Sequence, residues 1–256
     1  MFRIDLNSDL GEGYGAYKAG LDDKIIPLIT SANIACGFHA GDPLIMEKTV
    51  ALCKESGVCA GAHPGFPDLV GFGRRNLNAS PAEVKAMMTY QIGALAAFCK
   101  SQEIELSHVK PHGALYNMAA KDYSLAKAIC EAVYEFDKNL PLLALSGSQM
   151  QKAAEDVGTL FASEVFADRA YEDDGTLVVR SKPGAMITDE NEAVSRVIEM
   201  IKHKRVKTIN GNYVSIDPHS VCVHGDSEKA LQFVEKIREG FKTENIEICP
   251  IKEIIG

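Results

Sequence analysis

Seven short apolar runs recur along this chain, and each has the length of a buried strand. They lie near residues 4 to 9, 32 to 36, 58 to 62, 107 to 112, 141 to 146, 160 to 166 and 220 to 224. Helical patterns separate the runs, and such alternation predicts a parallel sheet with right-handed crossovers. The 256 residues match the ~250 of a single α/β barrel, so a closed seven-stranded (β/α) barrel is favoured over an open doubly wound sheet.

The helical patterns begin at recognisable start signals. Ser80-Pro81-Ala82-Glu83 is a capping box with proline at the first helical position. Further signals are Asp42 before Pro43, Asp122, Asp189 with Glu192, and Ser227. Each signal follows one of the predicted strands, as the alternation requires.

Two segments interrupt this alternation of strands and helices. Residues 64 to 79 contain two prolines and three glycines, so they predict an extended loop at the carboxyl face of the barrel. Residues 168 to 187 contain Asp174-Gly175 between two possible short strands, which predicts a hairpin insertion. Neither an internal repeat nor a linker is apparent, so residues 1–256 are expected to form a single barrel domain.

Charge and cysteine usage narrow the class of protein. The net charge of -8 argues against nucleic acid or an anionic membrane as the main partner, because both require clustered Lys and Arg. No apolar stretch approaches the ~18 residues of a membrane span, and the first residues lack a signal-peptide core, so a cytoplasmic protein is expected. The seven cysteines form no C-x-x-C pair and are interpreted as core residues rather than a disulfide framework.

Polar clusters follow six of the apolar runs. They are Asn7, Asp9 and Glu12; Asn33 and His39; His63; Lys110 and His112; Glu164 and Asp168; and His224 with Asp226. Because all the strands of a parallel barrel open onto one face at their carboxyl ends, these clusters are expected to converge on one pocket. Such a concentration of titratable groups is typical of an enzyme.

The alternation of side chains along a strand indicates which of these groups point inward. In the first run, the apolar Ile4, Leu6 and Leu10 must pack against helices, so Asp5, Asn7 and Asp9 are expected inside. The same reasoning groups Lys110 with His108 and His112. An inward lysine and several inward acids are costly to bury unless they are paired, so pairing is expected. Asp5 lies deeper than Asp9 and is interpreted as a structural hydrogen-bond hub.

Position along the strands separates the histidines, because catalytic groups in barrels lie at the carboxyl ends. Four histidines occupy such positions and are interpreted as functional: His39, His63, His112 and His224. Three others are interpreted as satisfied or solvated: His108, His203 and His219.

Several longer motifs resemble those of a known family. They are Asn7-Ser-Asp-Leu-Gly-Glu12-Gly, Ser31-Ala-Asn-Ile-Ala-Cys-Gly-Phe-His-Ala-Gly-Asp42, Gly61-Ala-His-Pro-Gly-Phe-Pro-Asp68, Gly71-Phe-Gly-Arg-Arg75, Val109-Lys-Pro-His-Gly-Ala-Leu-Tyr-Asn117, Glu164-Val-Phe-Ala-Asp-Arg-Ala-Tyr171, Asp174-Gly-Thr-Leu-Val-Val-Arg180 and Val223-His-Gly-Asp226. They are similar to the LamB/YcsF family, over nearly the whole chain. The resemblance implies a seven-stranded barrel of the glycoside hydrolase/deacetylase type.

The resemblance also implies an activity, that of the A subunit of a prokaryotic ATP-dependent 5-oxoprolinase that works with B and C subunits. The reaction would be hydrolysis of 5-oxo-L-proline to L-glutamate, coupled to ATP cleavage. The chain has no G-x-x-x-x-G-K-[ST] loop, and no G-x-G-x-x-G opens a helix after a strand. ATP with Mg is therefore expected mainly on the partner subunits, and no tightly bound metal is expected here.

For this reaction, each polar cluster receives an expected role. Asp9 or Glu12 would be the general base that activates water. Lys110 and His112 would stabilise the oxyanion or protonate the leaving nitrogen, and His63 and His224 would share the acid/base work. The expected substrate-binding residues are Asn7, Asn33, His39, Glu164 and Arg169. Arg169, Arg74 or Arg75 would hold a carboxylate or phosphate, because arginine makes bidentate contacts with both.

Two other functions stay open on the sequence alone. Members of the wider superfamily can bind a divalent metal through an aspartate and two histidines, and Asp9, His39 and His63 would serve in a stand-alone metal-dependent deacetylase. The first motif lacks the adjacent aspartates typical of those deacetylases, which weighs against this function. The other alternative is a non-catalytic assembly or regulatory subunit, which would have no reason to line a pocket with titratable groups.

Overall fold

The computed structural model describes residues 1–17, 20–223 and 228–256. Its strands are β1 (Phe2–Leu10), β2 (Ser31–Ala35), β3 (Cys59–His63), β4 (Leu106–Val109), β5 (Leu142–Leu145), β6 (Phe161–Phe166), β7 (Arg205–Lys207), β8 (Tyr213–Ser215), β9 (Ser220–Cys222) and β10 (Ile246–Ile248). Its α-helices are α1 (Asp22–Ile25), α2 (Pro43–Ser56), α3 (Pro81–Ser101), α4 (Gly113–Ala119), α5 (Tyr123–Phe136), α6 (Gln149–Val157), α7 (Glu190–His203), α8 (Glu228–Thr243) and α9 (Lys252–Ile255). A 3-10 turn, η1 (Ile26–Leu28), follows α1.

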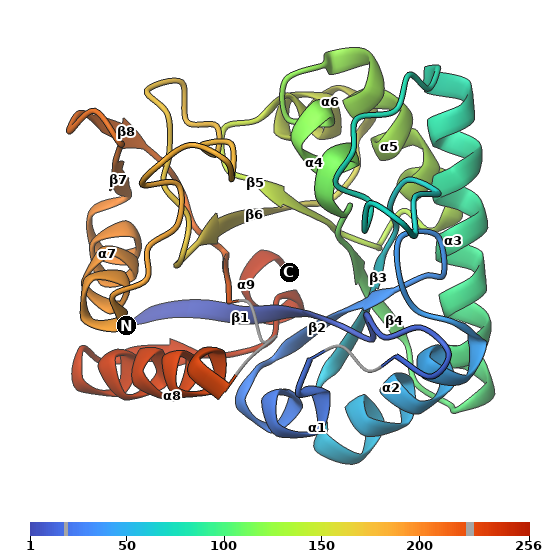
Figure 1. Cartoon of the computed structure of the whole chain (residues 1–256), viewed down its shortest axis with the longest axis horizontal. Coiled ribbons are helices and arrows are strands. Elements are labelled where there is room, and N and C mark those ends of the chain that lie inside the picture. Colours follow the sequence, from blue (N-terminus) through green and yellow to red (C-terminus); the bar gives the residue numbers. More distant parts are fainter. Residues whose placement is uncertain (18–19, 224–227) are drawn as a thin grey trace.

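Seven parallel strands close into a barrel in the order β1-β2-β3-β4-β5-β6-β9. The ring closes where Asp5 of β1 lies opposite Ser220 of β9. Helices surround the strands on the outside of the ring (Figure 1). All seven predicted runs therefore correspond to barrel strands, and the prediction of a closed seven-stranded (β/α) barrel is confirmed.

The helix starts also follow the sequence signals. The side chain of Asp42 accepts hydrogen bonds from the amides of Leu44 and Ile45 at the start of α2. The capping box of Ser80 and Glu83 is formed in both directions at the start of α3. Asp122 caps α5 and Asp189 caps α7 through backbone amides of their first turns. Ser227, the signal predicted for α8, lies outside the described residues.

Three parts of the fold differ from expectation. The segment 168–187 contains the predicted turn, with the Gly175 amide donating to the Glu172 carbonyl, but it forms only isolated antiparallel bridges instead of two strands. A regular hairpin lies later, where β7 pairs antiparallel with β8. Its three-residue strands bury little apart from Val206, so they have too few apolar positions to produce a visible pattern. β10 was also not predicted; it pairs with the amino end of β1.

Inside the barrel, below the polar face, the expected hub at Asp5 is present. Thr30, Ser31 and Ser220 all donate hydroxyl hydrogen bonds to its fully buried carboxyl group. Burial raises the pKa of Asp5 to about 6, even though these hydroxyls favour the charged form. Elsewhere all seven cysteines are free thiols. None of the helices within the described ranges is long and apolar enough to cross a membrane.

His108 lies within β4 and points into the barrel, where it is fully buried. Its ring nitrogens contact the Ser107 hydroxyl and the Asn33 side-chain oxygen, each at 2.7 Å. The interpretation of His108 as a satisfied histidine therefore fits its contacts. Burial lowers its pKa to about 3, so the ring is neutral. The neighbouring β3 makes room for the ring with Gly61, because a Cβ there would lie 2.1 Å from His108 Nε2.

We predict that Gly61→Ala destabilises the fold by about 1–3 kcal/mol, because the added methyl must displace His108 from both hydrogen bonds. Gly93→Ala is the matched control, since a Cβ at this position in α3 meets no atom within 4 Å. Replacing glycine by alanine inside a helix should stabilise the fold by about 0.5–1 kcal/mol. Urea unfolding of the two variants measures the difference, and equal free energies of unfolding would contradict the account.

Candidate active site

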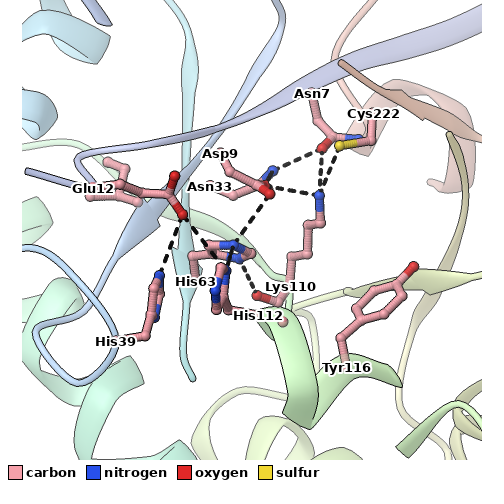
Figure 2. Close-up of polar contacts among 12 residues, drawn as sticks. Asn7, Asp9, Glu12, Asn33, His39, His63, Lys110, His112, Tyr116 and Cys222 are labelled. Atoms are coloured by element: carbon pink, nitrogen blue, oxygen red, sulfur yellow. Dashed lines mark hydrogen bonds and ion pairs between the residues drawn. The ribbon is translucent and has the colours of Figure 1, made fainter. Parts of the chain in front are cut away.

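The carboxyl ends of the strands bring a buried lysine together with two acids. Lys110 follows β4, and its ammonium group lies 2.9 Å from Asp9 Oδ1 and 2.7 Å from Glu164 Oε1. It also contacts Asn7 Oδ1 at 3.1 Å and Cys222 Sγ at 3.2 Å (Figure 2). Burial alone would lower the pKa of Lys110, but the charges of Asp9 and Glu164 outweigh it and hold the pKa well above its usual value. Lys110 is therefore a permanent buried cation, paired as expected.

A layer of side-chain amides lies beneath this ion cluster and orients it. The Asn33 amide donates to Asn7 Oδ1 at 2.8 Å and to Asp9 Oδ1 at 2.9 Å. The oxygen of Asn33 faces His108, so all of its polar atoms are used inside the protein. Neither Asn7 nor Asn33 lines the cleft described below; both position Asp9 and Lys110, and the substrate-binding role expected for them stays a prediction.

Three histidines form a second cluster beside the first. His39 comes from the loop after β2, His63 ends β3, and His112 precedes α4. The rings of His39 and His112 stack with centroids 3.6 Å apart, and His63 Nε2 lies 2.9 Å from His112 Nδ1. Glu12 closes the cluster, because its Oε1 lies 3.5 Å from His39 Nε2 and 3.7 Å from His112 Nδ1 (Figure 2).

Burial decides the charge of two of these rings. Both His39 and His112 have pKa values well below the usual histidine value, chiefly because burial penalises the charged form and then because the other rings lie close by. Both are therefore neutral near pH 7. Neutral imidazoles can accept a proton, donate a hydrogen bond or ligate a metal ion.

Members of the ion cluster and of the histidine cluster form the floor of a cleft. Asp9, Glu12, Lys110 and His112 line it, and its other lining residues include Arg74, Tyr116, Phe166, Arg169, Leu177 and Arg180. A larger adjoining cavity of about 620 Å³ shares the three arginines. The cleft thus combines a charged floor with a rim of positive charge, which suits a small anionic ligand.

The arginines expected from the sequence divide into two groups. Arg169 is buried beside the cleft, and its guanidinium donates to the Val178 carbonyl at 2.6 Å. Burial lowers its pKa to about 10, so it stays charged near pH 7. Arg74 lines the same cleft, whereas Arg75 is held in an ion pair by Asp68 and does not line it. The Asp68 pKa falls to about 2 because of that pair.

Some functional positions were missed by the sequence reasoning. Tyr116 of α4 is buried and donates its hydroxyl to Glu164 Oε2 at 2.7 Å, so it fixes the second acid of the ion cluster. Tyr116 lies in the motif that begins at Val109. Its position one turn into the helix that follows Lys110 is the feature of the sequence that could have identified it. Glu164 itself is fully buried and pairs with Lys110 instead of facing the cleft. His224 lies outside the described residues.

The sequence allowed a metal site formed by Asp9, His39 and His63, but the structure groups these histidines with a different carboxylate. Asp9 Oδ2 does lie 3.4 Å from His63 Nε2, but its other oxygen accepts from Lys110 and Asn33. The carboxylate that faces His39 and His112 is that of Glu12. Among the described residues, the four side chains whose ligand atoms lie within 4.8 Å of one another are those of Glu12, His39, His63 and His112.

Comparisons with known proteins agree with the motifs. A protein from Clostridium beijerinckii that is named as the A subunit of 5-oxoprolinase is 61% identical over 254 residues, which covers 99% of this chain and all of that protein. A protein of the same name from Pyrococcus abyssi is 54% identical over 254 residues, with the same coverage. The crystal structure of a lactam utilization protein from Thermus thermophilus matches with a TM-score of 0.91 and 45% identity, over 97% of this chain and 99% of that one.

A more distant structure has the same fold. It is a putative cellobiose-phosphate cleavage protein from Enterococcus faecalis V583, which matches with a TM-score of 0.61 at 12% identity, over 100% of this chain and 99% of that one. Across the whole barrel, residues 4–256 match the LamB/YcsF family. With its motifs, its fold and its relatives in agreement, this chain belongs to the LamB/YcsF family.

Proposed function

We propose that this chain is the A subunit of an ATP-dependent 5-oxoprolinase and that, with B and C subunits, it opens the lactam ring of 5-oxo-L-proline to give L-glutamate. The names of its relatives support this assignment. The observation that carries it is the buried Lys110 cation between Asp9 and Glu164 at the floor of an arginine-rimmed cleft. A cation fixed in a dry site is what a developing oxyanion requires.

The chemistry of the lactam defines what the site must supply. A lactam is a resonance-stabilised amide with a poor nitrogen leaving group, so the carbonyl must be activated and the nitrogen protonated. Phosphorylation of the amide oxygen by ATP meets the first need. One water then provides the new carboxyl oxygen while the ring C–N bond breaks and the nitrogen gains a proton; a second water releases phosphate, so the sum is glutamate, ADP and phosphate.

Three groups on the cleft floor fit these steps. Asp9 is paired with Lys110 and lines the cleft, so it is placed to accept a proton from the attacking water and to pass it to the ring nitrogen. Lys110 faces the same space and stabilises the negative charge that develops on the oxygens around the attacked carbon. His112 also lines the cleft, but its Nε2–H donates to the Phe72 carbonyl, so it holds the geometry of the site and leaves the proton transfer to Asp9.

The rim of the cleft provides recognition. The carboxylate of 5-oxoproline and the phosphate of an activated intermediate are both anions, and arginine binds both through paired hydrogen bonds. Arg74, Arg169 and Arg180 line the cleft and are the candidates for this contact. The absence of a phosphate-binding loop motif supports placing most of the ATP site, with its Mg, on the B and C subunits.

A role as a purely structural subunit fits the site less well. Burying Lys110 with two carboxylates costs several kcal/mol of desolvation, and a scaffold would gain nothing by placing that cluster at an open cleft. This cost is typical of a site that is retained for chemistry.

We predict that the purified chain alone forms no glutamate from 5-oxoproline and ATP, and that addition of purified B and C subunits produces it. The measurement is glutamate released per mole of chain, with B and C without this chain as the control. Sustained turnover by the isolated chain would show that the proposed division of labour is wrong.

A second prediction concerns Lys110. Lys110→Met removes the charge while keeping most of the length, so turnover of the complex should fall ~10²-fold or more. The substitution leaves two buried carboxylates without their cation, which costs about 3–5 kcal/mol of stability. Lys110→Met combined with Glu164→Gln removes one of those charges, so stability should recover while turnover stays low. A folded variant of either kind with normal turnover would exclude the catalytic role.

A third prediction separates the two neighbouring arginines. Arg74→Gln should raise the KM for 5-oxoproline ~10-fold or more, because a charge-assisted contact to the substrate anion is lost. Arg75→Gln should leave that KM within ~2-fold, because this guanidinium is paired with Asp68 away from the cleft. Loss of that ion pair should lower the stability of the fold instead. Steady-state kinetics of the assembled complex compares them. Equal effects on KM would contradict this interpretation of the rim.

A further inference from the structure

The hydrogen bonds of two histidines fix where their protons lie. His63 Nδ1 is 2.7 Å from the backbone carbonyl of Lys110, and His112 Nε2 is 2.8 Å from that of Phe72. A carbonyl oxygen can only accept, so each of these nitrogens must carry a hydrogen. In the neutral rings, His63 Nε2 and His112 Nδ1 therefore hold lone pairs.

These two lone-pair nitrogens face each other at 2.9 Å. Neither can donate to the other, so the contact is repulsive unless a cation lies against both. Carboxylate oxygens approach the same point, with Asp9 Oδ2 at 3.4 Å from His63 Nε2 and Glu12 Oε1 at 3.7 Å from His112 Nδ1. The arrangement calls for a positive charge, which is either an extra proton or a metal ion.

The third histidine favours the metal ion. His39 is buried, yet neither of its ring nitrogens makes a hydrogen bond within the part of the chain that is described. Its Nε2 points toward Glu12 Oε1 (Figure 2). A shared proton between His63 and His112 would leave this buried ring unsatisfied, which is costly. A metal ion would satisfy all three rings at once.

The surroundings of the rings are also those of a metal site. Metal-binding histidines almost always donate their second ring N–H to a carbonyl or carboxylate, as His63 and His112 do here. The loop 64–79 holds the rings in place: a Cβ at Gly65 would lie 2.7 Å from His39 Nδ1, and one at Gly73 would lie 2.6 Å from His39 Cβ. The backbone of this loop thus packs directly on the rings, so the ligands are preorganised.

We propose that Glu12, His39, His63 and His112 bind one divalent transition-metal ion, of which zinc is the best match to three imidazoles and one carboxylate. Magnesium and calcium prefer oxygen ligands and are disfavoured by this set. The ion would lie between the chain's first four strand ends, beside Asp9 and Lys110, where it would supply Lewis-acid polarisation of a bound oxygen. The proposal replaces the sequence expectation of no tightly bound metal, and it does not rest on the assignment as a 5-oxoprolinase subunit.

The first test uses the wild-type chain without partners or substrate. Protein stripped with a chelator is titrated with zinc by calorimetry, with magnesium as the comparison, and cobalt is added separately to record its visible absorption. We expect one zinc per chain, no comparable heat with magnesium, a higher midpoint of thermal unfolding with zinc, and cobalt bands typical of nitrogen and oxygen ligands. A stripped chain that takes up neither zinc nor cobalt would overturn the proposal in favour of a shared proton.

Variants then identify the ligands. His39→Ala and Glu12→Gln should each weaken zinc binding by ~10²-fold or more, since even loss of an outer partner costs 10–100-fold. His203→Ala is the matched control, because this histidine is exposed at the end of α7 and should bind zinc no differently from wild type. Asp9→Asn should retain zinc, which separates the proposed set from one built on Asp9, His39 and His63.

Circular dichroism of each stripped variant keeps loss of binding distinct from loss of fold. Should His39→Ala unfold, Glu12→Gln carries the same test, because it preserves the side-chain volume. Zinc binding that survives both substitutions in folded protein, or that is lost equally in His203→Ala, would place the ion elsewhere and refute the site.

Discussion

The carboxyl face of this barrel depends on one buried positive charge. An ammonium group inside a protein costs several kcal/mol unless it is paired, and the two carboxylates beside Lys110 would be as costly without it. The three charges therefore stabilise one another, and removal of any one of them leaves the others buried without full compensation. Because they come from β1, from the residue after β4 and from β6, their mutual dependence ties together three strands across the ring. The cleft, the orientation of Asp9 and the position of Tyr116 all follow from that arrangement.

The sequence predicted the parts of the fold that have a local cause. Apolar runs identified all seven barrel strands, and cap residues such as Asp42 and Ser80 identified helix starts. Alternation of faces placed Asp9 and Lys110 inside, where their charges meet. Each of these inferences needs only the identities of residues that are close together along the chain. The two strands of the β7–β8 hairpin are too short to leave such a local trace.

The missed features depend on distances across the barrel. The sequence could not determine that Glu12, and not Asp9, is the carboxylate that faces His39 and His112, because that choice depends on how the loop after β1 turns and on Asn33 holding Asp9 toward Lys110. Tyr116 of α4 and Glu164 of β6 meet from different elements, and nothing local to either residue indicates the contact. Periodicity indicates which face a side chain takes, whereas register and loop geometry determine which side chains meet there.

The closure of the ring has a consequence for how the chain folds. β1 is made first during synthesis, yet both β9 and β10, its partners on the closing side, come from the last part of the chain. The pairing of Asp5 with Ser220 spans 215 positions, so most of the loop-closure entropy must be overcome before the barrel is complete. Until then β1 has one open edge and an unsatisfied acid at Asp5. A nascent chain is thus most exposed to aggregation just before its final strands leave the ribosome.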